Sequence, residues 1–307
     1  MVSFYYKTIL KLIKKNADVL ILTADNGLSE YMMFHNLFPD RFINFGISEA
    51  NMISYAAGLA SCGKIPYTFA ISTFLTMRAY EQIRNDVCLQ KMNVKIIGIG
   101  GGMEFGEVGA SHHSIEDICI MRVLPGMKVI CPASNIEAKA AILASESIEG
   151  PIYIRLQQSS EEIFCKNYTF AIGKGIQLEY GRDITLISTG TIIHDVLYIV
   201  KILKEQGISC GLIHLPTIKP IDKEIIEKTA RETKAIITVE EHSSIGGLGS
   251  AVEEVLFELA CNNVIFRKIG ISDRFSKGYG THEELKKYNG IGKDIIKDTL
   301  TAVYKEI

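Results

Sequence analysis

The amino-acid sequence predicts an α/β protein built of two three-layer α/β domains with mainly parallel sheets. Short apolar segments alternate with amphipathic segments of helical length along the whole chain of 307 residues. This alternation is typical of parallel strands that helices cover on both faces. The length corresponds to two domains at roughly 100–200 residues each, and the periodicity lapses between residues 157 and 172. We therefore expect the two domains to be joined there.

The first half contains six apolar runs that are expected to form strands. They span residues 18–23, 41–45, 65–70, 94–99, 128–131 and 152–156. Helices are expected over 48–62, because Gly63 follows as a helix-ending residue, and over 74–92. Ser114 and Asp117 have the spacing of a capping box, which predicts another helix that begins there and ends before Pro125.

The second half shows the same alternation without an internal sequence repeat. Strands are expected over 184–188, 209–214, 235–240 and 264–269, and helices over 192–206, 222–231, 248–261 and 291–304. The expected domains are therefore residues 1–160 and 175–307, with a linker over 161–174.

The charge balance argues against a nucleic acid or a membrane as partner. The chain has 33 Lys plus Arg and 35 Asp plus Glu, so its formal net charge is -2. Without a basic field, neither nucleic acid nor an anionic lipid surface is expected to bind. Small anionic molecules bound at local sites remain possible.

Cysteine spacing and the apolar runs predict a cytoplasmic protein. The seven cysteines, at positions 62, 88, 119, 131, 165, 210 and 261, occur singly and form no CxxC pair. We expect reduced thiols that are mostly buried. Four lysines interrupt the apolar positions of residues 1–16, which is unlike a signal peptide. No apolar run reaches the roughly 18–20 residues that a membrane-spanning helix needs.

Glu49 stands in the first turn of the expected helix 48–62, after a strand that breaks at Gly46. A carboxylate there gains from the helix dipole, and for a lone glutamate this would be a sufficient explanation. The rest of the helix is apolar and rich in small residues, which predicts burial, and a buried carboxylate needs a partner. Glu49 is therefore a candidate site residue.

Phe74, Met77 and Tyr80 recur at helical spacing at the start of the next expected helix. Such a stripe usually faces a protein core. Aromatic rings and methionine also suit a flat pocket for a heteroaromatic ring. Periodicity alone does not choose between the two.

A loop with six glycines, residues 98–113, follows an expected strand. Open α/β sheets bind ligands at the carboxyl ends of their parallel strands. The loop does not fit the dinucleotide fingerprint, because Met103 stands where its third glycine should be, and it contains no phosphate-loop motif. His112 and His113 are either a surface pair or, as we favour for at least one of them, groups for proton transfer or substrate binding.

Arg155 lies at the end of the expected strand 152–156. A guanidinium at this sheet edge suits a phosphate or carboxylate ligand. A surface ion pair is the alternative, and it is nearly as well supported by the residue taken alone.

Taken together and in this order, these stretches resemble the C-terminal part of the transketolase family of thiamine-diphosphate enzymes. This family includes 1-deoxyxylulose-5-phosphate synthase and, more distantly, the β subunits of 2-oxo-acid dehydrogenases. The resemblance rests on DRFINFGISEANM at 40–52, TFLTMRAY at 73–80, GEVGASH at 106–112 and VEEHSSIGGLG at 239–249. Their joint occurrence is specific, and the match covers nearly the whole chain.

The resemblance implies a pyrimidine-binding domain over residues 1–160 and a transketolase C-terminal domain over 175–307. The family's diphosphate-binding domain, with its Gly-Asp-Gly motif, has no counterpart in these residues. The chain thus resembles one subunit of a split transketolase that is active only with a separately encoded diphosphate-binding subunit, in an α2β2 heterotetramer. Thiamine diphosphate and Mg²⁺ are the implied cofactors, with the diphosphate and the metal held mainly by the partner, so no metal ligand is expected here.

The resemblance also implies roles for individual residues. Glu49 matches the glutamate that hydrogen-bonds the cofactor's aminopyrimidine, and His112 matches a histidine that contacts substrate oxygens; both are implied to be catalytic. The implied cofactor contacts are Glu49, Phe74, Met77 and Tyr80. The implied substrate contacts are His112, His113, Arg155, Ser29 and Val108, with Arg155 on the substrate phosphate.

Four departures from the family pattern favour a non-standard sugar. Val108 replaces an aspartate that contacts a substrate hydroxyl, and Gly100 and Gly101 stand where a basic phosphate ligand is expected. His113 replaces a glutamine and Met77 an aromatic residue. Such polar losses change which substrate a buried site accepts, so we expect a less phosphorylated, deoxy or nucleotide-linked sugar.

The expected activity is the transfer of a two-carbon ketol unit from a ketose donor to an aldose acceptor. One alternative is a condensation of pyruvate with an aldehyde, as in 1-deoxyxylulose-5-phosphate synthase. A second is a non-catalytic homologue that only binds a partner. A 2-oxo-acid dehydrogenase β subunit is the weaker alternative, because the loop around His112 looks more like the sugar enzymes.

Overall fold

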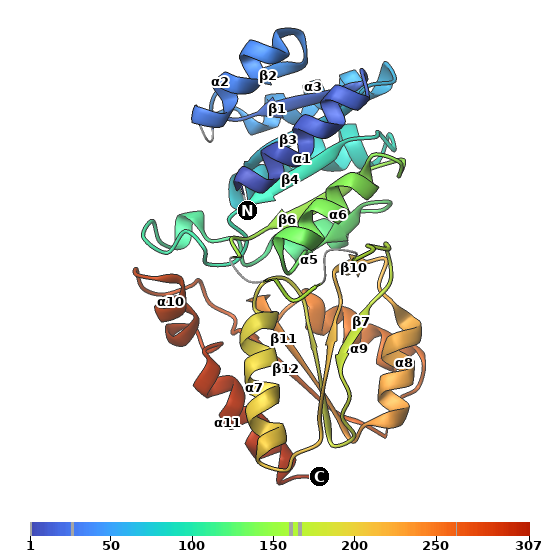
Figure 1. The fold of residues 1–307 in the computed structure, drawn as a ribbon, viewed down its shortest axis with the longest axis vertical. Coiled ribbons are helices and arrows are strands. Elements are labelled where there is room, and N and C mark those ends of the chain that lie inside the picture. The colour runs from blue at the N-terminus through green and yellow to red at the C-terminus, as the bar shows by residue number, and fades with distance from the viewer. Residues whose placement is uncertain (1, 26–27, 160–161, 165–167, 262) are drawn as a thin grey trace. The chain divides into compact units, whose positions relative to one another are not determined.

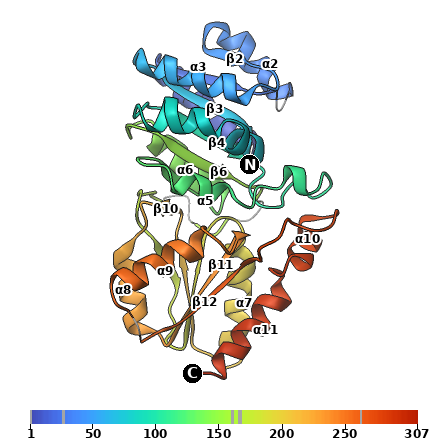
Figure 2. The same cartoon turned by 180° about the vertical axis from the view of Figure 1, so that it is seen from behind.

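The computed structural model describes residues 2–25, 28–159, 162–164, 168–261 and 263–307. Contacts divide the chain into two compact units, one of residues 1–101 and 120–171 and the other of residues 102–119 and 172–307. Each unit contains a mostly parallel sheet with helices on both faces (Figures 1 and 2). The predicted fold class is confirmed.

All six strands expected in the first half are present in the first unit. They are β1 (Val19–Thr23), β2 (Phe42–Asn44), β3 (Ile65–Ile71), β4 (Lys95–Ile99), β5 (Lys128–Ile130) and β6 (Ile152–Leu156). They run parallel in the order β5-β6-β4-β3-β1-β2. In this register Leu22 lies opposite Thr68, and Gly98 lies opposite Arg155. The carboxyl ends of the six strands therefore share one edge of the sheet.

Helices cover both faces of this sheet. They are α1 (Val2–Lys15), α2 (Leu28–Leu37), the 3₁₀ turn η1 (Pro39–Arg41), α3 (Glu49–Ser61), α5 (Asp117–Arg122) and α6 (Asn135–Ser145). α1 packs against α6 (Figure 1), and on this face Tyr5 stacks on Phe69 while the Tyr67 hydroxyl lies 3.0 Å from Ser145 Oγ. α3 covers the opposite face (Figure 2) and contacts β3 and the helical segment that follows it.

The expected helix 74–92 is less regular and shorter than predicted. Two π-helical turns, η2 (Phe74–Arg78) and η3 (Ile83–Cys88), flank the short helix α4 (Tyr80–Gln82). A π turn bonds each residue to the fifth along the chain, which widens the helix, and such turns are frequent at functional sites. Residues that α-helical spacing would put on one face are therefore displaced around the segment.

The capping box expected at Ser114 is wrong. The N–H of Ser114 donates to the Gly102 carbonyl at 2.7 Å, and its carbonyl accepts from the Gly102 N–H at 2.9 Å. These two bonds hold Ser114 in an antiparallel bridge, so the helix begins only at Asp117.

The second unit has a five-stranded sheet in the order β12-β11-β8-β9-β7. Its strands are β7 (Ile176–Glu179), β8 (Ile184–Ser188), β9 (Cys210–His214), β11 (Ala235–Ser243) and β12 (Ile265–Ile271), and a further short strand is β10 (Thr217–Lys219). β7 is antiparallel to β9, and the other pairs are parallel. β8, β9, β11 and β12 confirm predicted strands, whereas β7 and β10 were not expected.

The helices of the second unit pack in pairs. They are α7 (Ile193–Glu205), α8 (Lys223–Glu232), α9 (Leu248–Glu258), α10 (His282–Tyr288), α11 (Lys293–Tyr304) and the 3₁₀ turn η4 (Ala110–His112). α7 contacts α11, and α8 contacts α9. Residues 102–119, which follow β4 along the chain, make their contacts with this second unit.

The cysteine prediction holds in part. The six cysteines that the structure describes are free thiols, of which Cys88, Cys131 and Cys210 are buried, while Cys165 lies outside the described residues. Half of the described thiols are therefore buried, rather than most. Within the described ranges, none of the helices has the length and apolar character required to cross a lipid bilayer.

Candidate active site

The candidate residues of the first unit follow strands whose carboxyl ends share one sheet edge. Glu49 follows β2, Phe74 follows β3, Gly101 follows β4 and Arg155 lies near the end of β6. β6, β4 and β3 are direct neighbours, and β1 separates β3 from β2. Open parallel sheets bind ligands at this edge.

Glu49 is buried, with 2 % of its surface exposed, in the first turn of α3. Its Oε2 accepts a hydrogen bond from Arg78 Nη1 at 2.6 Å, so the carboxylate has the partner that its burial requires. The Arg78 side chain is 45 % exposed. The ion pair therefore extends from the interior to the surface of the unit.

The same arginine contacts Phe74. The Arg78 guanidinium carbon lies 4.7 Å from the centre of the Phe74 ring, a cation–π contact. Met77 is 41 % exposed, and Thr73 Oγ1 lies 3.9 Å from its sulfur. The Tyr80 hydroxyl donates to the carbonyl of Ile120 at 3.0 Å. Phe74 and Tyr80 are half-buried, so these three predicted side chains do not form a uniform core stripe.

Arg155 is buried, with 2 % exposed, which excludes the surface ion pair considered as the alternative. A Cβ atom added at Gly101 would lie 2.7 Å from Arg155 Nε, so a side chain at 101 would collide with the guanidinium. The neighbouring Gln157 is also buried and donates from Nε2 to the Gly101 carbonyl at 3.0 Å. Gly101 thus stands in place of a basic residue because Arg155 occupies the adjacent space.

In the second unit, Glu241 holds the start of the glycine loop. Its buried Oε1 accepts from the Met103 N–H at 2.6 Å and lies 2.7 Å from His282 Nε2. A Cβ atom at Gly102 would lie 2.3 Å from Oε1, and the positive φ of Gly102 also favours glycine there. The negative charge of Glu241 raises the pKa of His282. Residues 102 and 103 are therefore fixed to β11 and to the first turn of α10.

The two loop histidines differ in environment. His113 is buried, 2 % exposed, and its Nδ1 hydrogen-bonds with Ser276 Oγ. Burial lowers the pKa of His113. His112 ends η4, is half-buried and has Nδ1 3.0 Å from Ser111 Oγ. Val108 is 47 % exposed in the same loop, so the predicted substrate contacts of this loop combine one buried and two more accessible side chains.

Sequence reasoning missed several residues that organise these sites. Arg78, Gln157, Glu241, His282 and Ser276 were not singled out, although TFLTMRAY and VEEHSSIGGLG contain two of them. Their partners lie far away in sequence, and no periodic pattern reports such pairs. Ser29 lies in α2, but its side chain is outside the part that the structure describes.

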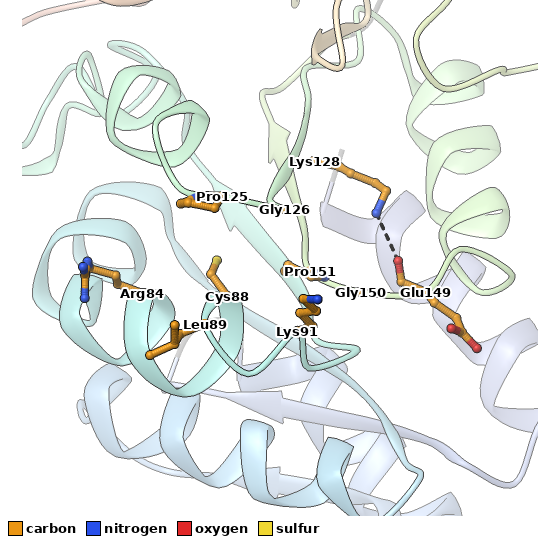
Figure 3. Close-up of a pocket in the computed structure, with 10 residues that line it drawn as sticks. All are labelled: Arg84, Cys88, Leu89, Lys91, Pro125, Gly126, Lys128, Glu149, Gly150 and Pro151. Carbon is orange, nitrogen blue, oxygen red and sulfur yellow. Dashed lines mark hydrogen bonds between the residues drawn. The ribbon is translucent and has the colours of Figure 1, made fainter.

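A pocket of about 560 Å³ lies in the first unit at the other edge of the sheet (Figure 3). Its lining residues are Arg84, Cys88, Leu89, Lys91, Pro125, Gly126, Lys128, Glu149, Gly150 and Pro151. Lys128 begins β5, and Pro151 directly precedes β6, so the pocket faces the amino ends of the strands. None of the candidate residues lines it.

The side chains of Glu49 and Phe74 fit a planar ring that carries N–H donors. A buried carboxylate accepts such donors, and an aromatic face stacks on a flat group. The Arg78 guanidinium, which is flat and rich in N–H groups, already makes both contacts. Within the ranges that the structure describes, no group of three or more His, Cys, Asp and Glu side chains is placed to hold a metal ion.

Two family models match the chain. The model "Transketolase, pyrimidine binding domain" matches residues 1–161, and the model "Transketolase, C-terminal domain" matches residues 173–296. Together they account for most of its length.

Individual relatives agree with these matches. A putative transketolase C-terminal section of Methanocaldococcus jannaschii is 43% identical, over 98% of this chain and 96% of the relative. One of the subunits of an apulose-4-phosphate transketolase of Phocaeicola vulgatus is 34% identical, over 97% and 96%. A 1-deoxy-D-xylulose-5-phosphate synthase of Geobacter sulfurreducens is 35% identical over 92% of this chain but only 45% of its own length.

A solved structure has the same fold over the whole chain. It is described as "Split gene transketolase, inactive beta4 tetramer", with a TM-score of 0.88 and 37% identity over 99% of this chain and 97% of that one.

Proposed function

Because the chain belongs to the transketolase family, we propose that it is the C-terminal subunit of a split, thiamine-diphosphate-dependent transketolase. The observation that carries the proposal is the match, over nearly the full length of both proteins, to relatives described as a transketolase C-terminal section and as a transketolase subunit. A transferase role agrees with this family membership. The buried Glu49 at the carboxyl edge of the first sheet supplies a suitable carboxylate.

When bound, thiamine diphosphate supplies a nucleophilic carbon and an electron sink for breaking a carbon–carbon bond. We assign to Glu49 a hydrogen bond with the aminopyrimidine, which a buried carboxylate can hold without competition from water. Phe74 provides the stacking surface, and Met77 and Tyr80 lie in the same segment to enclose the ring. Tyr80 contributes its ring rather than its hydroxyl, because the hydroxyl donates to Ile120.

We assign substrate binding to Arg155, His112, His113, Ser29 and Val108. A buried arginine suits a phosphate or carboxylate group. His112 is the candidate for contact with the reacting oxygens, because it is more accessible than the buried His113. Val108 cannot hydrogen-bond a sugar hydroxyl, which favours a non-standard sugar. One relative is named for apulose-4-phosphate, an unusual sugar, which supports this expectation.

The partner is a separately encoded subunit that holds the diphosphate and Mg²⁺, and the active assembly is an α2β2 heterotetramer. Support comes from the solved relative, whose β chains alone are described as an inactive tetramer. We expect this chain alone to behave in the same way, with no turnover until the partner is added.

A synthase-like condensation of pyruvate with an aldehyde is the second candidate, favoured by the similarity to 1-deoxy-D-xylulose-5-phosphate synthase. The two reactions differ in one product, because the synthase reaction releases CO₂ from pyruvate and the transketolase reaction does not. A non-catalytic homologue is the third candidate.

The test measures turnover by the chain alone and by its mixture with the product of the neighbouring reading frame, with thiamine diphosphate, Mg²⁺ and a panel of ketose donors and aldose acceptors. Turnover only in the mixture supports the split transketolase. CO₂ release from pyruvate would favour the synthase reaction instead. Assembly without any cofactor-dependent change would favour the non-catalytic homologue.

A further inference from the structure

One guanidinium occupies both of the groups that we assign to the cofactor's pyrimidine. Arg78 donates to Glu49 Oε2 at 2.6 Å and stacks on Phe74 at 4.7 Å from the ring centre. Arg78 ends the π-helical turn η2 that begins at Phe74. The widened turn therefore brings the guanidinium over the Phe74 ring and beside the start of α3.

A guanidinium and an aminopyrimidine share the features that these two groups recognise. Both are flat, carry N–H donors beside a nitrogen-bearing carbon, and can stack on an aromatic face. Both donate to a carboxylate. The same carboxylate and ring cannot make these contacts with two flat groups at once, so the two must compete.

Resting on the function proposed above, we propose that Arg78 is an internal competitor for the pyrimidine and sets the affinity of this subunit for the cofactor. In the cofactor-free chain it satisfies the charge of buried Glu49, which would otherwise be left unpaired. Cofactor binding displaces it.

The displaced side chain has somewhere to go. Arg78 is already 45 % exposed, so its guanidinium can regain water without unfolding the segment. Glu49 is 3 % exposed, so it stays in place and exchanges one N–H donor for another. The movement is thus confined to the arginine side chain.

The first test measures the dissociation constant of thiamine diphosphate, with Mg²⁺, by calorimetry on the complex of this chain with its partner. We expect Arg78→Ala to bind about tenfold more tightly than wild type, the order expected for removing one partly screened charged hydrogen bond from the competing state. Arg78→Lys should lie between them, because an ammonium pairs with Glu49 but stacks poorly. Unchanged or weaker binding by Arg78→Ala would overturn the inference.

Arg84→Ala is the matched control. Arg84 lies further along the same helical segment, but its Nη1 donates to Asn85 Oδ1 at 2.6 Å and not to Glu49. Its loss should leave the cofactor affinity unchanged. A merely structural role of Arg78 would weaken binding in Arg78→Ala, so the sign of the change separates the two explanations.

A second test restores the competitor from solution. Methylguanidinium at millimolar concentration should raise the apparent dissociation constant of thiamine diphosphate for Arg78→Ala and leave that of wild type nearly unchanged. Equal effects on both proteins would contradict a vacated guanidinium site. If wild type and all variants assemble with the partner but bind no cofactor, the proposed function itself is wrong; if all bind equally, only the role of Arg78 is wrong.

Discussion

The carboxylate of Glu49 is the group on which the proposed reaction depends most. We predict that Glu49→Gln lowers turnover of the assembled enzyme by about a hundredfold or more, because the amide cannot exchange a proton with the cofactor ring. The amide is nearly isosteric, and the half-exposed Arg78 can turn to solvent, so folding and assembly should persist. Turnover and light scattering on the same samples check both points. Wild-type turnover in the variant would remove Glu49 from the mechanism.

Val108 should determine which donors are accepted. We predict that Val108→Asp raises kcat/KM for hydroxylated transketolase donors relative to the preferred sugar, by about tenfold, as expected for one regained hydrogen bond. The residue is 47 % exposed in its loop, so the substitution should not disturb the fold. Val123→Asp, at a position that is 67 % exposed, is the matched control. Identical relative kcat/KM values across a donor panel would show that Val108 does not select the substrate.

His282 should make stability depend on pH. Glu241 raises its pKa above the ordinary value of 6.5, so the folded protein holds the proton more tightly than the unfolded chain. This contribution is complete below the unfolded pKa and is lost as the pH rises through the raised folded pKa. We predict that His282→Gln costs more unfolding free energy at about pH 6 than at about pH 9. Urea unfolding of both proteins at the two pH values measures this.

The control for that measurement is His35→Gln, because His35 is exposed on α2. A cost of His282→Gln that is the same at both pH values would mean that the pair with Glu241 does not carry a charge-dependent contribution.

Individual residues could be predicted from the sequence only where their local setting was informative. Glu49 was found because an otherwise apolar helix predicts its burial, and the predicted need for a partner is met by Arg78. Arg78 itself could not be found, because the pair joins residues 29 positions apart. Glu241 could not be found either, since its bond to the Met103 N–H spans 138 positions. Roles that depend on such contacts need the tertiary structure.

Among the elements, the amino end of α9 depends on one buried side chain. The carboxylate of Glu240, 1 % exposed, accepts from the N–H groups of Leu248 and Gly249 at 2.6 and 2.7 Å. We predict that Glu240→Ala lowers the free energy of unfolding by about 1–3 kcal/mol, because both donors lose a buried partner. Thermal and urea unfolding measure the cost.

Glu253→Gln provides the comparison for this prediction. Glu253 lies in the same helix but pairs with Lys268 at the surface, where its side chain is 54 % exposed. Its loss should change stability by no more than about 0.5 kcal/mol. Equal costs for Glu240→Ala and Glu253→Gln would show that the cap contributes little.

Elements with a strong local signal were predicted well, and the others depended on contacts. The strands of both units are continuous apolar runs, buried on both faces, which periodicity detects. Three local signals were misread: Thr281 and Glu284 form a true capping box for α10, and Ser134 caps α6, yet the box expected at Ser114 is absent. The same spacing of residue types thus gave a helix start or a bridge, depending on what lay nearby.

For the whole molecule, cofactor binding should appear as stabilisation of the assembled enzyme. A ligand that binds only the folded state stabilises it by about 2.7 kcal/mol at a hundred times its dissociation constant. We predict that thiamine diphosphate with Mg²⁺ raises the Tm of the mixed subunits more than that of this chain alone. Calorimetric scans of the chain, the partner and the mixture check this, and no shift in the mixture would favour the non-catalytic homologue.

The assignment of residues 102–119 to the second unit means that its sequence is discontinuous. The glycine loop is fixed there by Glu241 of β11, and it carries His112 and Val108. A chimaera that exchanges only residues 172–307 with a relative would separate this loop from the side chains that hold it. Transplanting a sugar preference between related subunits would therefore require two grafts made together, the insert at 102–119 and the carboxyl-terminal half.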